Sequence, residues 1–212
     1  MLSKLIQWFA AATLLLSVTA QAEFQPGQHY KVLPQPVIVP ADGRVHVEEA
    51  FWYGCPACFR LEDFLTPWKK NLPADVQFTG VPAMLGRTWI AHAQLYYVAD
   101  VLGVGEQVHS EIFRTYHLER QPLVRRADQR NFLVEKAGVS AADFDKAYES
   151  FAVKTRIKQA DQRIRAFGII GVPALIVQGK YVVDSASAGS MEQMLKVADH
   201  LIALERAALK GK

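Results

Sequence analysis

The chain has only two cysteines among its 212 residues, and this scarcity excludes several classes of protein. One pair of cysteines cannot supply the two to four disulfides that staple a small secreted scaffold. A structural zinc site needs four ligands, and the sequence has neither a second C-x-x-C pair nor a pair of histidines nearby. Attachment of a c-type haem requires histidine directly after the second cysteine, where this chain has Phe59.

An excess of charge of one sign is also lacking. The chain has 24 basic and 21 acidic residues, and without residues 1–22, whose one charged residue is Lys4, 23 and 21 remain, a net charge of +2. A chain so close to neutral lacks the excess of positive charge that is typical of nucleic-acid-binding proteins, so we expect no nucleic-acid partner. After residue 22 there is no repeat, low-complexity tract or second long apolar run, and about 190 residues suit one domain or one domain with an insertion.

The first 22 residues have the pattern of a secretory signal peptide. Lys4 precedes an apolar run from Leu5 to Val18, and Ala20-Gln21-Ala22 is a small-residue cleavage signature. The run is shorter than the about 20 residues of a membrane-spanning helix, which disfavours the alternative of an uncleaved anchor. We therefore predict cleavage near Ala22, a mature chain that begins at Glu23, and a location in a bacterial periplasm, where disulfides persist.

The two cysteines lie in the segment Phe51-Trp52-Tyr53-Gly54-Cys55-Pro56-Ala57-Cys58. A disulfide that stabilises a fold usually closes a long loop, because a long loop loses more unfolded-state entropy. A bridge across two residues adds little stability, so the spacing favours thiol–disulfide exchange over two inert buried cysteines. Pro56 suits the first turn of a helix, where its missing N–H would be unpaired anyway. Because the start of a helix favours a thiolate, we predict Cys55 as the nucleophile and Cys58 as the buried resolving cysteine.

Apolar patterning predicts strands on both sides of a long helical region. Strands are expected around 30–33, 45–52 and 75–81, with a helix over 56–70 after the second of them. Residues 88–167 show apolar residues at helical spacing and no good strand candidate, so we expect four or five helices there. A hairpin is expected over 172–183 and a last helix from 191 to about 204, with Arg206, Lys210 and Lys212 fraying. A C-x-x-C pair beside such a βαβ pattern is typical of a thioredoxin-like redox fold.

The motifs, in this order, resemble those of the DsbA family of periplasmic thiol:disulfide interchange proteins. The resemblance rests on the aromatic residues before C-P-x-C, the helical insertion, Gly171-Val172-Pro173-Ala174 about 115 residues later, and Gly179-Lys180-Tyr181 in the hairpin turn. It implies an α/β protein, a thioredoxin fold with an inserted helical subdomain. The segments would be a signal peptide (1–22), a first half with the CPAC site (23–87), the insert (88–167) and a second half with the cis-Pro loop, hairpin and C-terminal helix (168–212). Ala57 departs from the best-known members, which carry histidine there; this affects the strength of the oxidant, not the reaction type.

The resemblance also implies roles for residues outside the cysteine pair. Pro173 is expected to be cis and to present the backbone of Val172 to a substrate strand; the alternative is an ordinary trans proline at a strand start. Glu49 resembles the family's buried acid beneath the cysteines, and its neighbour Glu48 should then point to the other side of the strand. Glu62 resembles a second such acid or lies on a solvated helix face.

Further candidates concern the surroundings of the cysteines. Trp52, Pro56 and Ala57 are predicted to contact substrate, together with Val172 and Pro173. Large rings near Cys55 either line an apolar surface for unfolded substrates or pack in the core; they are Trp52, Tyr53, Phe59 and Trp89. The six histidines are scattered, and we expect surface or core positions for them and no metal ligand; they are His29, His46, His92, His109, His117 and His200.

The function that the resemblance implies is oxidation of thiols in newly exported proteins by exchange through a redox-active disulfide between Cys55 and Cys58. No other cofactor is expected, the chain would act as a monomer, and a DsbB-type membrane protein would reoxidise it. A periplasmic reductase or isomerase of the same fold is an alternative, although isomerase relatives carry an N-terminal dimerisation domain, for which the short segment before the first long strand leaves no room. A non-catalytic chaperone is a third possibility, which the two intact cysteines around Pro56 oppose.

Overall fold

A mixed sheet of five strands forms the centre of the computed structural model, which describes residues 24–211. The strand order is β1 (Lys31–Val32), β5 (Tyr181–Asp184), β4 (Ala174–Val177), β2 (Val45–Phe51) and β3 (Val76–Pro82). Strands β2 and β3 are parallel, and the other neighbouring pairs are antiparallel. Parallel neighbours need a crossover connection, which α1 (Pro56–Lys70) supplies between β2 and β3. The predicted signal peptide lies outside the described residues.

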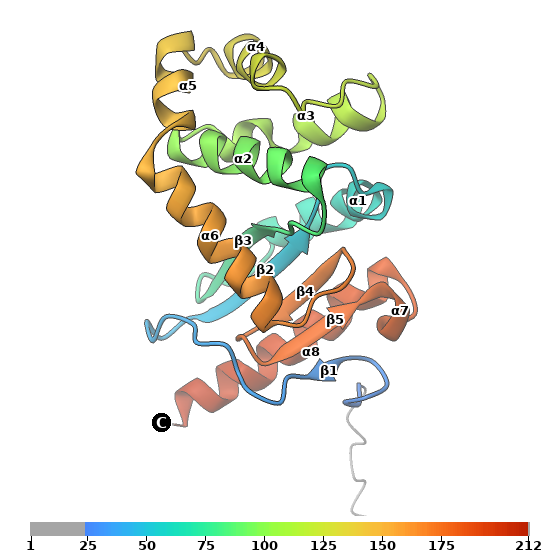
Figure 1. The fold of residues 1–212 in the computed structure, drawn as a ribbon. Helices are drawn as coiled ribbons and strands as arrows, with labels where there is room; N and C mark the ends of the chain where they lie inside the picture. The colour runs from blue at the N-terminus through green and yellow to red at the C-terminus, as the bar shows by residue number, and fades with distance from the viewer. Residues whose placement is uncertain (1–23, 212) are drawn as a thin grey trace, which may run out of the picture.

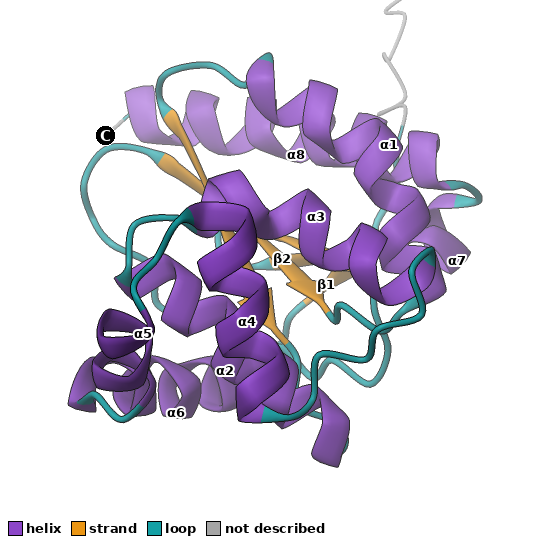
Figure 2. Cartoon of the chain, turned by 90° about the horizontal axis from the view of Figure 1, so that it is seen from above, coloured by secondary structure: helices purple, strands orange, loops and turns teal. Residues whose placement is uncertain are grey.

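Helices cover both faces of this sheet. On one face α8 (Met191–Lys210) contacts β2, β4 and β5 and packs beside α1, as the view from above shows (Figure 2). On the other side α2 (Arg87–Val101) and α6 (Phe151–Ala166) contact β3. The short helix α7 (Ser185–Ala188) connects the hairpin to α8. The sheet is therefore the middle layer of three.

Successive side chains of β4 point to opposite faces of the sheet, so this one strand contributes to two apolar clusters. Leu175 and Val177 belong to the apolar cluster under α1 and α8, whereas Ala174 and Ile176 belong to the cluster on the insert side. Successive side chains of a strand point to opposite faces, so a strand covered on both faces is apolar at every position. The central strand β2 follows the same rule: all seven of its residues are buried.

Five helices follow one another between β3 and β4: α2, α3 (Gly105–His117), α4 (Arg126–Ala137), α5 (Ala141–Tyr148) and α6. They lie above the sheet in Figure 1, and α6 runs back down to it. Side-chain caps begin two of them, since Ser140 accepts the Asp143 N–H and Ser150 accepts the Val153 N–H. Gly138 ends α4 with a φ of 68°, a conformation that favours glycine. The predicted number of helices in this region is confirmed.

The last helix is longer than the sequence predicts. It continues to Lys210 instead of ending near residue 204, and Leu201, Ile202 and Glu205 are buried along it. Arg206 donates from Nε to Asp75 Oδ2 at 2.7 Å, so the expected fraying of Arg206 and Lys210 was wrong; Lys212 lies outside the described residues. The reason is tertiary: packing across the sheet stabilises turns whose local sequence is highly charged.

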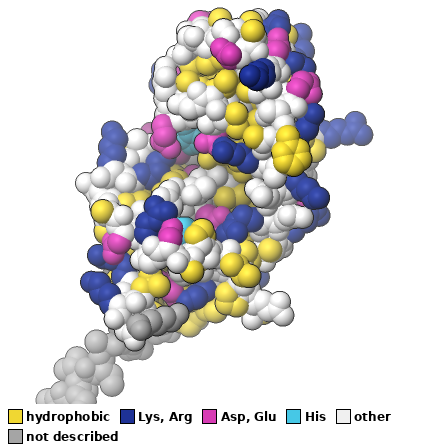
Figure 3. All heavy atoms as spheres, turned by 90° about the vertical axis from the view of Figure 1, so that its left-hand side faces the viewer, with side chains coloured by type: hydrophobic (Ala, Val, Ile, Leu, Met, Phe, Trp, Pro, Cys, Tyr) yellow, Lys and Arg dark blue, Asp and Glu magenta, His cyan; other side chains and the backbone are white. Residues whose placement is uncertain are grey.

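Among residues 24–211, no helix combines the length and apolarity of a membrane span. On the face drawn in Figure 3, basic and acidic side chains are interspersed over both the insert and the sheet region.

Candidate active site

Cys55 occupies the N-cap of α1, and Pro56 is the first residue of the helix, as predicted. The Cys55 sulfur accepts a hydrogen bond from the backbone N–H of Cys58 at 3.3 Å, so the thiol itself caps the helix. The turn before it is tight: a Cβ on Gly54 would lie 2.3 Å from the Trp52 ring. Glycine is therefore required at position 54 to present Cys55 at this helix end.

The two sulfurs have opposite acidities. A hydrogen bond with Cys58 lowers the pKa of Cys55 to about 6, and the backbone N–H groups of Cys58 and Ala57 and the charge of Arg60 act in the same direction against partial burial. Burial raises the pKa of Cys58 well above its ordinary value, and its hydrogen bond with Cys55 adds to the effect. At neutral pH the reduced pair is therefore one thiolate, Cys55, and one thiol, Cys58.

This asymmetry predicts a thiolate that titrates in the acid range. Raising the pH of the reduced protein should produce the thiolate absorbance near 240 nm with a midpoint at about 6, and the oxidised protein is the blank because it has no thiol. The N–H donors stabilise only the charged form of Cys55, which gives the direction of the shift. A midpoint near ~8.5, the value for a free cysteine, would contradict the assignment of Cys55 as an activated nucleophile.

The loop before β4 lies directly against Cys55. The Val172–Pro173 peptide bond is cis, as expected, and the Val172 carbonyl oxygen lies 3.5 Å from the Cys55 sulfur. Pro173 is buried and Val172 is half-buried. A cavity of about 360 Å³ adjoins this contact, and Ala57, Ile170, Val172 and Pro173 are part of its lining. The fold thus brings together residues that are more than a hundred positions apart in the sequence.

A second cluster lies below the cysteines. Glu49 on β2 is 1% exposed and Glu62 on α1 is 6% exposed, so Glu62 is not on a solvated face. His109 on α3 brings its Nε2 to 3.6 Å from Glu62 Oε1, which is within ion-pair distance but too long for a hydrogen bond. The Tyr53 hydroxyl lies 2.9 Å from His109 Nδ1. Glu49 Oε1 and Glu62 Oε1 have no hydrogen-bond partner among the described residues.

The two buried carboxyl groups differ in their affinity for a proton. Burial raises the pKa of Glu49 to about 8, and the charge of Glu62 adds to this while Lys69 opposes it. Burial also acts to raise the pKa of Glu62, but His109, Lys69 and the Thr66 hydroxyl at 3.2 Å outweigh it and lower that pKa. The proton therefore resides on Glu49 and the negative charge on Glu62.

Glu49, Glu62 and His109 are the side chains among the described residues whose arrangement could hold a metal ion. One oxygen from Glu49, one from Glu62 and one imidazole nitrogen from His109 lie within 4.8 Å of one another. Oxygen and imidazole ligands of this kind suit zinc or another divalent transition metal. The expectation that the chain uses no metal stays a prediction.

Some of the large rings near the cysteines lie partly at the surface, and one packs in the core. Trp52 stacks on Trp89 with 4.3 Å between ring centroids, and both are half-buried beside the site. Phe59 is half-buried and stacks on His117 at 4.7 Å. Tyr53 is 2% exposed and belongs to the core. The first three are therefore available to a ligand in part, whereas Tyr53 is not.

The sequence interpretation missed His109, Arg60 and the hydroxyl of Tyr53. None of them carries a motif, and the contact of His109 joins three separate elements. One signal existed: His109, Ile112 and Phe113 share a face at helical spacing, which places the histidine on the buried side of its helix. Only the packing of that helix on α1, however, identifies Glu62 as its neighbour.

Comparison with known proteins decides the family. A family model described as a DSBA-like thioredoxin domain matches residues 55–196. The chain belongs to the DsbA family. It is 40% identical over 201 residues to the thiol:disulfide interchange protein DsbA of Pseudomonas aeruginosa, and the match covers 94% of this chain and 95% of that one. It is also 40% identical over 202 residues to the DsbA of Pseudomonas syringae, covering 95% and 94%.

Solved structures of DsbA proteins have the same fold. The crystal structure of Pseudomonas aeruginosa DsbA superimposes with a TM-score of 0.83 at 40% identity, covering 88% of this chain and 97% of that one. Oxidoreductase DsbA from Xylella fastidiosa gives a TM-score of 0.81 at 29% identity, covering 87% and 98%. The predicted α/β fold, a thioredoxin fold with a helical insertion, is confirmed, and this DsbA-family chain is a thiol:disulfide oxidoreductase with Cys55 and Cys58 as its C-x-x-C pair.

Proposed function

We propose that this DsbA-family chain is a periplasmic oxidase that introduces disulfide bonds into newly exported proteins. The supporting observation is the unequal environment of the two sulfurs, with the pKa of Cys55 lowered to about 6 and that of Cys58 raised. A stable thiolate stabilises the dithiol form, so the disulfide form becomes a stronger oxidant. The predicted signal peptide supports the location.

The reaction proceeds in two exchanges. A substrate thiolate attacks the Cys55 sulfur of the oxidised protein, the Cys55–Cys58 bond breaks, and its electron pair passes to Cys58, which takes up a proton. A second substrate thiolate then attacks the substrate sulfur of the mixed disulfide and displaces Cys55 as a thiolate. The substrate leaves with a disulfide, and the two electrons remain in the dithiol of Cys55 and Cys58. The acidity of Cys55 makes it the better leaving group in the second step.

Glu49 is the proposed proton donor to Cys58. Its carboxyl group is buried next to the pair, and its charge contributes to the raised pKa of Cys58. Because the pKa of Glu49 is raised to about 8, the group holds its proton at neutral pH and loses it as the pH rises through 8. Proton donation, and with it the first exchange, should therefore weaken above this pH.

Substrate binding is assigned to the surface beside Cys55. The backbone of Val172, whose carbonyl lies 3.5 Å from the Cys55 sulfur, would pair with an extended substrate segment as an added strand. Such pairing reads no side chains, which suits many different clients. Pro173 holds this loop, and Trp52, Pro56 and Ala57 supply apolar contact around it.

The remaining parts of the cycle follow from the chemistry. Each turnover leaves the chain reduced, so a partner must accept two electrons, and a DsbB-type membrane protein is the proposed acceptor. The chain would act as a monomer and use the redox-active disulfide as its only redox group. We further propose that residues 23–87 and 168–212 form the thioredoxin-like unit, and residues 88–167 the insert.

The direct test is oxidation of a reduced, unfolded, disulfide-containing protein by the stoichiometric oxidised chain. We expect one reduced Cys55–Cys58 pair to appear for each disulfide formed in the substrate, because this pair accepts the two electrons. Alkylation after acid quench counts the thiols on both partners. If the substrate stays reduced while the chain keeps its disulfide, the oxidase proposal is wrong, and the reductase or isomerase alternative takes its place.

A further inference from the structure

We infer that His109 is a positioning residue of the exchange reaction, which acts through Glu62 to keep the transferable proton on Glu49, next to Cys58. This inference rests on the proposed function, because it concerns the proton that Cys58 takes up when the disulfide opens. It assigns a role to a histidine on the helical insert, a part of the chain without a reacting group. The geometry around His109 supports each step.

Tyr53 fixes the orientation of the imidazole. The Tyr53 hydroxyl and His109 Nδ1 are 2.9 Å apart in a fully buried setting, and burial raises the pKa of Tyr53 well above its ordinary value, so the phenol keeps its hydrogen. With the phenol as the donor, Nδ1 is the acceptor and Nε2 carries the ring hydrogen. Nε2 faces Glu62 Oε1 at 3.6 Å, an oxygen without another partner among residues 24–211. The imidazole therefore presents an N–H to the carboxylate in either protonation state.

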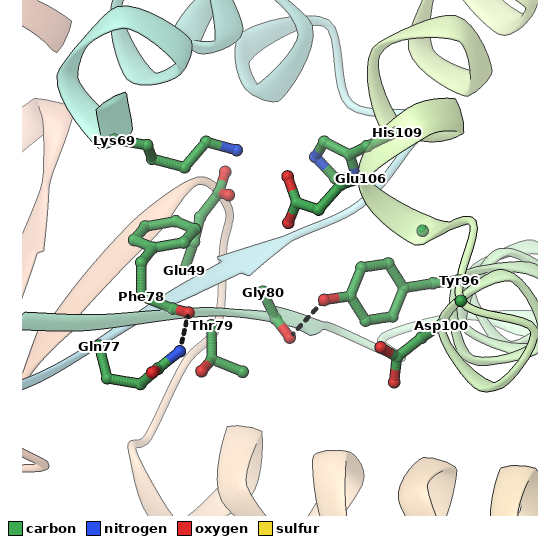
Figure 4. A pocket seen from close by; sticks show the side chains of 12 residues that line it. Glu49, Lys69, Gln77, Phe78, Thr79, Gly80, Tyr96, Asp100, Glu106 and His109 are labelled. Carbon is green, nitrogen blue, oxygen red and sulfur yellow. Dashed lines mark hydrogen bonds between the residues drawn. The ribbon is translucent and has the colours of Figure 1, made fainter. Parts of the chain in front are cut away.

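The ionisable groups around His109 come from several elements. Glu62 and Lys69 lie on α1, Glu49 on β2, Tyr96 on α2 and Glu106 on the first turn of α3. Figure 4 shows Glu49, Lys69, Glu106 and His109 converging on one cavity from three sides. Its volume is about 330 Å³, and its lining also includes Tyr96 and Asp100 on α2, the loop before α3 and residues of β3.

Two carboxyl groups this close cannot both ionise easily, so they share one proton at neutral pH. The neighbours decide which of the two holds it. The N–H of His109 and the Thr66 hydroxyl favour charge on Glu62, whereas burial without a hydrogen-bond partner at Oε1 favours a neutral Glu49. Removing the imidazole removes the main stabilisation of the Glu62 charge, and the proton then moves toward Glu62. Glu49, in contrast, is among the groups that contribute most to the raised pKa of Cys58.

The cavity gives the proton a route to solvent. Glu49 donates its proton to Cys58 in the first exchange and must regain one before the next cycle. Because Glu49 and His109 both line the cavity, water that enters it reaches the carboxyl group without passing the cysteines or a bound substrate. Proton return is thereby separated from the surface that Val172 and Pro173 offer to substrate.

The test is the pH profile of a single turnover. Oxidised chain is mixed with excess dithiol peptide, quenched with acid and alkylated, and the rate is divided by the thiolate fraction of the peptide at each pH. In His109→Phe we expect the rate to fall with rising pH about one unit lower than in the native chain, where the fall lies at about 8, so that the rate at pH 8 is about fivefold lower than that of the native chain. His109→Gln keeps an N–H donor and should recover most of the rate.

A matched control is available on β2. His46 is also a buried histidine beside a carboxylate, with Nε2 3.0 Å from Asp42 Oδ1, but it lies outside the cluster beneath the cysteines. His46→Phe should leave the profile unchanged. Thermal unfolding of each variant checks that the fold persists, and the glutamine variant keeps the test valid if the phenylalanine variant does not fold.

A double-mutant cycle separates a role through Glu62 from a general effect on packing. Glu62→Gln should itself move the profile to lower pH, and adding His109→Phe should then change the rate less than twofold. An equal loss in both backgrounds, or a His109→Phe profile with the native shape, would overturn the inference. If the native chain fails to oxidise the peptide at all, the proposed function fails instead, so the two failures are distinguishable.

Discussion

Replacing Cys55 or Cys58 with alanine is expected to abolish catalytic turnover, with a rate loss on the order of 10³-fold or more in each case. The two variants should nevertheless differ in one product. Cys58→Ala keeps the thiolate of Cys55, whose pKa is about 6, and should accumulate a mixed disulfide when offered an oxidised substrate, because the resolving thiol is absent. Cys55→Ala keeps only the buried Cys58, whose raised pKa holds it as a thiol, and should accumulate none.

Non-reducing gels after acid quench and alkylation measure this difference. Each variant is the control of the other, since both lose one sulfur from the same helix turn. Equal amounts of mixed disulfide in the two variants, or more in Cys55→Ala, would show that the sulfurs are not divided into an attacking and a resolving thiol.

Replacing Arg163 with methionine is expected to cause a large loss of stability. Arg163 on α6 binds Glu48 on β2 through two hydrogen bonds, from Nε at 2.6 Å and from Nη2 at 2.5 Å. Glu48 is 6% exposed, so the variant leaves a buried carboxylate without its partner. Breaking such a pair costs about 3 kcal/mol or more, which lowers the melting temperature by roughly 6–12 °C for a chain of this size.

The control for this prediction is an exposed pair in the insert. Arg125 lies 2.7 Å from Asp128 with 82% of its side chain exposed, and Arg125→Met should leave the melting temperature nearly unchanged. The double variant Glu48→Gln/Arg163→Met should recover much of the stability that Arg163→Met loses, because no unpaired buried charge remains. If Arg163→Met and Arg125→Met melt at the same temperature, the Glu48 pair does not tie the insert to the sheet.

Local signals were sufficient to predict the site around the cysteines. Pro56 at the first helical position, the apolar strand before it and the Val172–Pro173 loop each depend on neighbouring residues, and the family resemblance added the cis bond. The family resemblance indicated the buried position of Glu49, and strand alternation required Glu48 and Glu49 to lie on opposite sides of the strand. Glu48 does lie on the opposite face of β2, and because this central strand is covered on both faces, that acid is buried as well and binds Arg163.

What the sequence did not reveal depends on contacts between distant elements. His109 meets Glu62 and Tyr53 across separations of about fifty residues, and no local pattern encodes that meeting. The end of α8 is a similar case, since Arg206 is held by Asp75 from the other half of the chain. In both cases tertiary packing overrides what the local sequence favours.

The measurement that tests the account most directly is the equilibrium potential of the Cys55–Cys58 couple in glutathione buffers at about pH 7. DsbA itself has an established potential of about −120 mV and a Cys pKa of about 3.5. With the pKa of Cys55 at about 6, the thiolate is about 2.5 units less stabilised, which at 29.6 mV per tenfold change lowers the potential by about 70 mV. We therefore predict a potential between about −120 and −200 mV, that of an oxidase weakened by Ala57. A potential near −270 mV, as in thioredoxin, would contradict the account and mean that the chain donates electrons.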